Sequence, residues 1–261
     1  MIRVIIAAGF LFSLALAAAC SGGDDGSGTV VVNIAPDLSS IPEGLTEADA
    51  ITGIVTVFEQ RAMAYGGSAD VRRNDDGTLS VEVSDIAADV AADLFGKTAR
   101  LRIQAPHRND PETILCKAAD GTETPVPQGD IEYPVTGATR LPRCRLSADV
   151  LGDIVWEPLF GDFSEKLTAD EVATIALKTE EGPTLLIVYD RNASAVLQAA
   201  TIQLDGLPMG IFLDGTLIAG PTISEPILSG TIAVAGLSLR DTRILKAQLE
   251  AGELPVAVSL A

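Results

Sequence analysis

The chain has few of the residues that usually perform catalysis. Its 261 residues include one histidine and three cysteines, and only 4% are aromatic. Any Ser-His-Asp triad would have to use His107, the only histidine. The sequence also has no GxSxG segment, the motif that carries the nucleophilic serine in one class of hydrolases. No cluster of histidines and cysteines indicates a metal site, and "DDGSG" lacks the spacing of a calcium loop. We therefore expect no enzyme activity, no catalytic residue, no bound metal and no cofactor.

Basic residues are also scarce, with 18 Lys and Arg against 36 Asp and Glu and a formal net charge of −18. A surface of this sign disfavours nucleic acid and flat binding to anionic lipid, because phosphate groups would face carboxylates. With 47% hydrophobic residues, the composition is typical of a globular protein with an acidic surface. Asp75-Asp76 and Glu180-Glu181 are interpreted as a solvated turn and a charged helix end, not as a glycosidase pair.

Beyond the first twenty residues, no apolar run reaches the roughly 18 residues that span a bilayer. The start, "MIRVIIAAGFLFSLALAAAC", predicts a signal peptide over 1–19. Ala17 to Ala19 before Cys20 resemble the lipobox of bacterial lipoproteins, although Ala17 stands where that family usually has leucine. The resemblance implies a lipid on Cys20, and residues 20–28 fit a flexible tether. A plain secreted protein or an uncleaved anchor are the alternatives.

Two cysteines remain, Cys116 and Cys144. An even pair in an exported chain favours a disulfide, which would stabilise the fold by roughly 3 to 4 kcal/mol in the chain-entropy model. A reactive thiol is the alternative, but no CxxC motif supports it.

Periodicity in the first half predicts a regular α+β pattern. The expected elements are a strand at 29–35, a helix from Thr46 to Tyr65, two strands around Asn74 to Gly77, a helix over 86–95 and a strand over 97–106. The order strand, helix, strand, strand, helix, strand is the split βαβ pattern. We therefore expect a ferredoxin-like sheet with both helices on one face.

The second half begins with a loop-rich stretch over 107–163. After it we expect a short helix at 168–177, a strand at 183–190, a helix at 192–206, a hairpin over 209–223, a strand at 227–236, a helix at 238–252 and a closing strand. The hairpin turn is Leu213 to Thr216, where Asp-Gly supplies positive φ.

Residues 190–255 resemble the first periplasmic domain of SecD, a subunit of the bacterial Sec protein-export machinery. The resemblance rests on an LDG turn, a following proline, an EPI segment and an AG-LP helix end. The matching residues are Leu213, Asp214, Gly215, Pro221, Glu225, Pro226, Gly252 and Pro255. For these residues, a structural role as turns and strand ends is favoured over direct binding.

The amino-terminal half resembles the base subdomain of SecD, most clearly at Gly96, Lys97 and Thr98. The resemblance implies a ferredoxin-like base subdomain, an inserted α+β head subdomain and a closing strand. The boundaries that it implies are 29–106 for the base, 107–252 for the head with a disulfide-stapled insertion at 107–163, and 253–261 for the closing strand.

SecD continues into transmembrane helices that, with its partner SecF, perform a proton-driven cycle. This chain stops at Ala261, so we expect a copy without that motor, attached to the membrane through its lipid only. The leading hypothesis is an exported lipoprotein, on the outer face of the cytoplasmic membrane or at the outer membrane, that binds unfolded or translocating polypeptide or Sec translocase subunits. The alternative is a structural or envelope-interaction lipoprotein that keeps the fold without a role in export.

Overall fold

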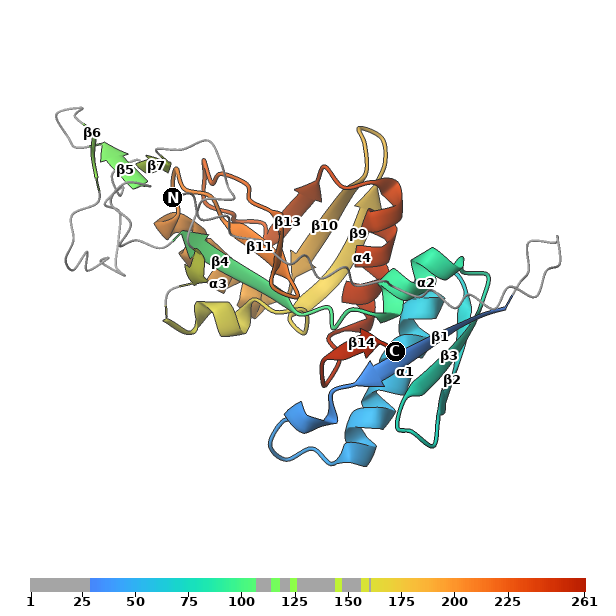
Figure 1. The fold of residues 1–261 in the computed structure, drawn as a ribbon. Coiled ribbons are helices and arrows are strands. Elements are labelled where there is room, and N and C mark those ends of the chain that lie inside the picture. The colour runs from blue at the N-terminus through green and yellow to red at the C-terminus, as the bar shows by residue number, and fades with distance from the viewer. Residues whose placement is uncertain (1–28, 107–113, 118–122, 126–143, 147–155, 160) are drawn as a thin grey trace, which may run out of the picture.

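The computed structural model contains two units, the base and the head, which are joined by helix α4 (Figure 1). The predicted signal peptide, Cys20, the tether and His107 lie outside the described residues. The described residues are 29–106, 114–117, 123–125, 144–146, 156–159 and 161–261. In these ranges, no helix combines the length and the apolar character that crossing a membrane requires.

The base is a four-stranded antiparallel sheet in the order β14-β1-β3-β2. Its elements are β1 (Val30–Pro36), the 3-10 helix η1 (Leu38–Ser40), α1 (Glu47–Tyr65), β2 (Ser68–Arg73), β3 (Leu79–Ser84), α2 (Ala88–Phe95) and β14 (Val258–Leu260). Since β3 lies between β1 and β2, the β1-α1-β2 unit is split, as in ferredoxin-like folds. The predicted fold class is confirmed.

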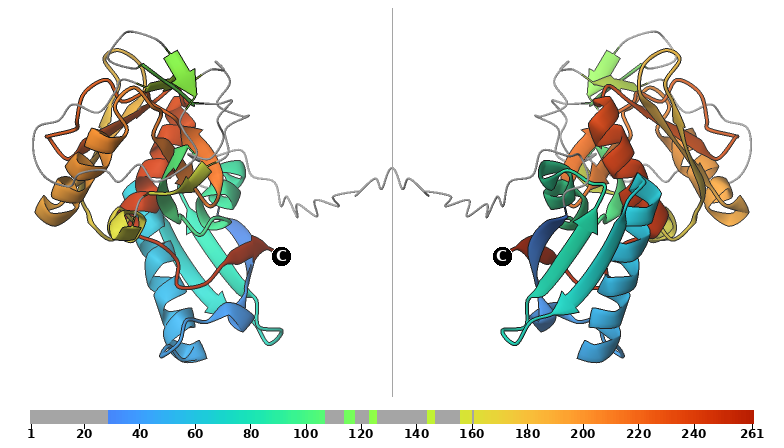
Figure 2. Two further views of the ribbon diagram at one scale, coloured as in Figure 1. Left: turned by 90° about the vertical axis from the view of Figure 1, so that its left-hand side faces the viewer. Right: turned by 90° about the vertical axis from the view of Figure 1, so that its right-hand side faces the viewer.

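Alternating burial along β3 shows which face of the base sheet is covered. Leu79, Val81 and Val83 are fully buried, while Glu82 is exposed. Helices α1 and α2 pack on the buried face, and their side chains share one core with the strands. Figure 2 shows α1 running along one side of this sheet. The other face is lined by exposed or half-buried residues.

Helix α1 begins and ends where the sequence predicts. Thr46 forms a capping box with Asp49, in which each side chain accepts a hydrogen bond from the other residue's backbone N–H. Gly66 ends the helix with φ of 110°, a left-handed conformation that favours glycine. Both ends of this helix are therefore set by local sequence signals.

The prediction that the strand after α2 completes the base sheet is wrong. That strand, β4 (Leu101–Pro106), pairs with β11 of the head, and Leu101, Ile103 and Ala105 lie in the head core. The place beside β1 is taken by β14, which pairs as Ile34 with Leu260. The ferredoxin-like order is thus completed by the last strand of the chain, and the head is inserted between α2 and β14.

The head contains two larger sheets, in the orders β13-β10-β9 and β12-β11-β4-β8, and a small sheet β6-β5-β7. Its elements are β4, β5 (Ile114–Lys117), β6 (Glu123–Pro125), β7 (Cys144–Leu146), β8 (Trp156–Pro158), η3 (Gly161–Lys166), β9 (Val172–Lys178), β10 (Thr184–Tyr189), α3 (Arg191–Gln203), β11 (Gly210–Leu213), β12 (Thr216–Ala219), β13 (Thr231–Ala235) and α4 (Leu239–Ala251). The predicted strands, helices and hairpin after residue 183 are confirmed.

The predicted helix at 168–177 is wrong, because this segment forms strand β9. The helix-start signal is used locally instead: the N–H and the hydroxyl of Thr168 both donate to the carboxylate of Glu171 and close a turn. Three of the following residues, Val172, Thr174 and Ile175, are β-branched, and the segment pairs with β10, for example Ile175 with Ile187. Glu180 and Glu181 consequently lie in the β9–β10 turn and not at a helix end.

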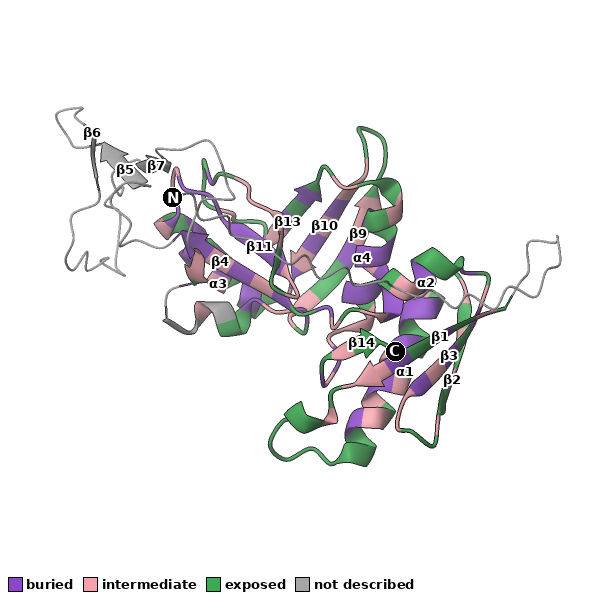
Figure 3. Cartoon of the chain, in the orientation of Figure 1, coloured by how far each residue is buried: buried purple, intermediate pink, exposed green. Residues whose placement is uncertain are grey.

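Helix α4 belongs to both units. Ile244 and Ala247 pack in the base core, whereas Leu245 and Leu249 pack in the head core. Figure 3 shows this helix largely buried between the two units. Because opposite stripes of one helix are buried in separate cores, α4 fixes the two units against each other.

Candidate functional site

The chain crosses between base and head twice, at residues 96–100 after α2 and at residues 252–255 after α4. The structure brings three of the sequence motifs together at these crossings: Gly96 to Thr98, the Leu213 to Gly215 turn, and Gly252 to Pro255. We call this region the head–base junction. Two charged side chains hold it together: one comes from helix α1, and the other comes from the hairpin turn between β11 and β12.

The first of these side chains is Arg61, on the buried face of α1. Its guanidinium donates to the carbonyls of Leu94 and Lys97 (3.0 and 2.5 Å) and to those of Thr98 and Gly252 (3.0 and 3.4 Å). The side chain is fully buried. One cation therefore satisfies carbonyl groups of both crossings, where the chain has no regular secondary structure to pair them.

Burial lowers the pKa of Arg61 to about 10, and the negative charge of Asp214 opposes that shift. The guanidinium stays protonated at neutral pH. Its Nε has no hydrogen-bond partner among the described residues. Arg61 is thus a buried cation that is compensated by backbone carbonyls together with a nearby carboxylate.

Asp214, in the hairpin turn between β11 and β12, is the second of these side chains. Its carboxylate accepts hydrogen bonds from the backbone N–H groups of Ala99 (3.1 Å) and Arg100 (2.9 Å), and its own N–H donates to the Arg100 carbonyl (3.0 Å). Asp214 and Gly215 have φ values of 49° and 77°. These angles confirm the turn predicted from the sequence.

The second crossing is tied to the first. The Leu254 N–H donates to the Thr98 carbonyl (2.9 Å), and Glu253 forms ion pairs with Arg100 and Arg102 (2.7 and 3.3 Å). Pro255 packs on α1 at Gly53, where an added Cβ would lie 3.2 Å from the proline ring. The AG-LP motif is thus a docking segment for the base.

The remaining motif residues lie elsewhere. Pro221 lies just after β12, where its carbonyl accepts from the N–H of Met209 (2.9 Å), and the pairing continues to Ile223, whose N–H donates to the Leu207 carbonyl (2.9 Å). Glu225 and Pro226 lie in an exposed loop. That loop is fastened where Ile227 donates its N–H to the Thr201 hydroxyl (2.9 Å). These positions fit the predicted roles as turns and strand ends.

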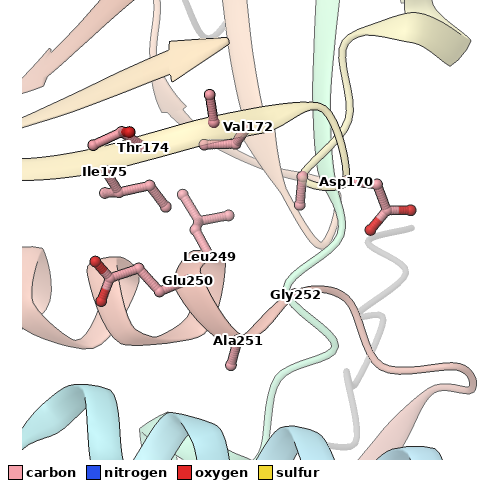
Figure 4. A pocket seen from close by; sticks show the side chains of 10 residues that line it. Asp170, Val172, Thr174, Ile175, Leu249, Glu250, Ala251 and Gly252 are labelled. Atoms are coloured by element: carbon pink, nitrogen blue, oxygen red, sulfur yellow. The ribbon is translucent and has the colours of Figure 1, made fainter. Parts of the chain in front are cut away.

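A different kind of surface lies along β9. This strand is the last in its sheet and pairs only with β10 among the described strands. Backbone groups on the outer side of an edge strand can accept another strand. Beside this edge runs a groove of about 450 Å³, the β9 groove, between the first half of β9 and the end of α4 (Figure 4). Its lining comprises Ala169, Asp170, Val172, Ala173, Thr174, Ile175 and Leu249 to Gly252.

The β9 groove is lined by apolar side chains and by two acidic side chains. In Figure 4, Ile175 and Leu249 point toward each other from strand and helix, while the carboxylates of Asp170 and Glu250 lie toward opposite ends. Asp170 is exposed, and Glu250 is paired with Lys246 (2.5 Å). Ala173 and Thr174 on the strand are exposed. The groove therefore lies beside an exposed strand, while Ile175 and Leu249 in its lining belong to the head core.

The two cysteines predicted to pair are backbone partners: Cys116 on β5 lies opposite Cys144 on β7 in the antiparallel register. The disulfide itself stays a prediction. Among the described residues, no group of three or more His, Cys, Asp or Glu side chains could hold a metal ion.

Two parts of these sites were missed at the sequence level. Arg61 had a usable signal, because it lies at the spacing of Ile54 and Phe58 and so puts a charge on the buried stripe of α1. The β9 groove had none, since its strand was predicted as a helix.

Comparison with known proteins agrees with this arrangement. Residues 163–256 match the family model described as SecDF, P1 head subdomain. The crystal structure of SecDF in Super-membrane-facing form aligns with 20% identity and a TM-score of 0.59, over 91% of this chain and 30% of its own. A structure described as that of a membrane component SecDF that enhances protein export aligns with 19% identity and a TM-score of 0.57, over 89% of this chain and 98% of its own. No curated protein matches the sequence.

Proposed function

We propose that this chain, a SecD periplasmic-domain-like protein, binds extended polypeptide outside the cytoplasm through the edge of β9. The proposal starts from the premise that this is a protein-export-related domain. The match to the SecDF P1 head family model and the similarity to SecDF structures support that premise. The chain spans 30% of the full-length SecDF structure, so a function in export is inferred for the domain and not taken from the whole protein.

The observation that supports the proposal is the unpaired outer edge of β9 beside the β9 groove. An extended segment that adds to such an edge gains main-chain hydrogen bonds independent of its sequence, while the neighbouring groove receives its side chains. Exported polypeptides share an unfolded backbone and little else, so recognition through the backbone suits this class of ligand. In this role the protein binds and does not catalyse.

In-cell photocrosslinking tests the proposal. A photoreactive residue at Thr174, exposed on β9, should crosslink to newly synthesised exported polypeptides or to Sec translocase subunits. The matched control is Thr56, exposed on α1 in the base. Enrichment at 174 over 56 supports binding at the edge. Equal yields at the two positions would instead favour a structural or envelope-interaction protein with no role in export.

The proposed location follows from the lipobox-like sequence before Cys20. The protein would be attached by lipid to a membrane and face the periplasm or the exterior, and two or three acyl chains are enough for stable attachment. Cys20→Ala should release the protein from sedimented membranes into the soluble extracytoplasmic fraction. A Cys20→Ala protein that still sediments with membranes would rule out this anchor.

A further inference from the structure

We propose that the β9 groove prefers extended segments that place a lysine or arginine side chain beside Asp170. This preference rests on the proposed function and names the class of polypeptide segment that the same edge selects. It is argued from the charges that surround the groove.

The first source of negative potential is the end of α4. The last carbonyl groups of a helix have no partners within the helix, and together they act as a partial negative charge. Helix α4 ends at Ala251, which lines the groove, and no basic residue lies in its last turn. Only one carbonyl at this end, that of Gly252, accepts from Arg61, at 3.4 Å.

The second source is the carboxylate of Asp170, at the start of β9. It is exposed, and no ion pair with it is found among the described residues. The third source, Glu250, is partly neutralised because Lys246 pairs with it four residues earlier on the same helix. The uncompensated negative charge therefore lies at the Asp170 end, where the last residues of α4 also line the groove.

The apolar part of the lining sets the form of the partner. Val172, which is half-buried, lines the groove together with Ile175 and Leu249, of which little surface is exposed. Side chains of an added strand alternate between faces, so every second residue of the ligand would face the same way. A segment with apolar residues and one basic residue on that face fits the groove, whereas an acidic segment would be repelled by it. The net charge of −18 on the whole chain acts in the same direction at long range.

Binding of matched peptides tests this preference. The probes are two labelled nine-residue peptides in which valine and threonine alternate from a first valine, blocked at both ends, with either lysine or glutamine in place of the central valine. At low salt, the lysine peptide should bind the whole protein about two- to fivefold more tightly, as expected for a partly exposed charge pair. The ratio should fall toward one in 0.5 M salt because the attraction is screened.

Two variants locate the effect. Asp170→Asn should abolish the difference between the two peptides while both still bind, and Glu59→Gln, at an exposed position on α1, should leave the difference unchanged. Equal affinity of both peptides for the unmodified protein would overturn the charge preference and leave edge binding intact. If neither peptide binds, the proposed function fails and the preference fails with it.

Discussion

The head–base junction and the β9 groove meet at the C-terminal end of α4, yet they are built in opposite ways. At the junction, the Gly252 carbonyl accepts from the buried Arg61, and both crossings are closed by hydrogen bonds. In the groove, the same end of the helix faces the exposed residues Ala173 and Thr174 of an unpaired strand edge. Most of the motif residues cluster at the junction, whereas Pro221, Glu225 and Pro226 lie elsewhere in the head. The groove has no sequence signal of its own, and the outer edge of its strand leaves backbone groups unpaired with any other described strand.

The largest effect should come from breaking the junction. Arg61→Met keeps a long side chain but leaves the Lys97 carbonyl without its buried donor, and it removes one of the two donors to the Leu94 carbonyl, the other being Gln248. We expect a loss of about 3 to 5 kcal/mol in the free energy of unfolding, measured by urea titration. Arg243→Met, at an exposed position on α4, is the control and should change it by less than about 0.5 kcal/mol. A similar small change for both variants would contradict the role of Arg61.

The predicted disulfide lies outside both regions and should stabilise the head insertion. Mass spectrometry without reduction should show Cys116 linked to Cys144. Reduction should then lower the free energy of unfolding by roughly 3 to 4 kcal/mol in the chain-entropy model. A Cys116→Ser/Cys144→Ser double variant should be equally destabilised and insensitive to reductant. Two free thiols in the exported protein would disprove the pairing.

A smaller effect is expected at the hairpin turn. Asp214→Asn keeps a residue that tolerates the φ of 49°, but it removes the charge near Arg61 and one of the oxygens that accept backbone N–H groups. We expect a loss of about 1 to 2 kcal/mol by urea titration. Asp75→Asn, in the exposed turn of the base hairpin, supplies the comparison and should be close to neutral. Equal losses in the two turns would mean that the Asp214 contacts add no stability.

The smallest effect on stability is expected in the groove, together with a clear effect on binding. Ala173→Lys places a charge on the exposed edge of β9, a substitution that discourages strand addition. Stability should change by less than about 0.5 kcal/mol, while crosslinking from position 174 should fall. Ala233→Lys, at an exposed position on β13 at the other side of the same sheet, should leave crosslinking unchanged. Loss of crosslinking in both variants would mean that the added positive charge lowers binding wherever it stands on the sheet, and would contradict a specific role of the β9 edge.

Local signals determined how much of the fold was predictable from sequence. The Thr46 cap and the Asp214-Gly215 turn depend on neighbouring residues, and both are found where predicted. The base sheet is completed by β14 and not, as predicted, by β4. This outcome depends on which distant segment pairs with β1, and the spacing of hydrophobic residues along the chain holds no information about that pairing. At 168–177, the sequence predicts a short capped helix, but pairing of Ile175 with Ile187 makes this segment a strand.

The same distinction applies to the candidate sites. The motif residues could be named from sequence, but their meeting at Arg61 could not, since its partners Leu94 and Gly252 are 33 and 191 residues away. The β9 groove combines an edge strand with the end of a helix that follows much later in the chain. It is a product of the tertiary fold, so no contiguous stretch of sequence indicates it.

Hydrogen–deuterium exchange of the whole protein, with and without a permanently unfolded, reduced and carboxymethylated polypeptide, tests the central claim most directly. If the edge of β9 accepts an added strand, amides within residues 172–178 should become protected, because outward N–H groups gain acceptors. Amides at the junction, around residues 96–100, should not change. Absence of protection in β9, or protection confined to the junction, would contradict the account.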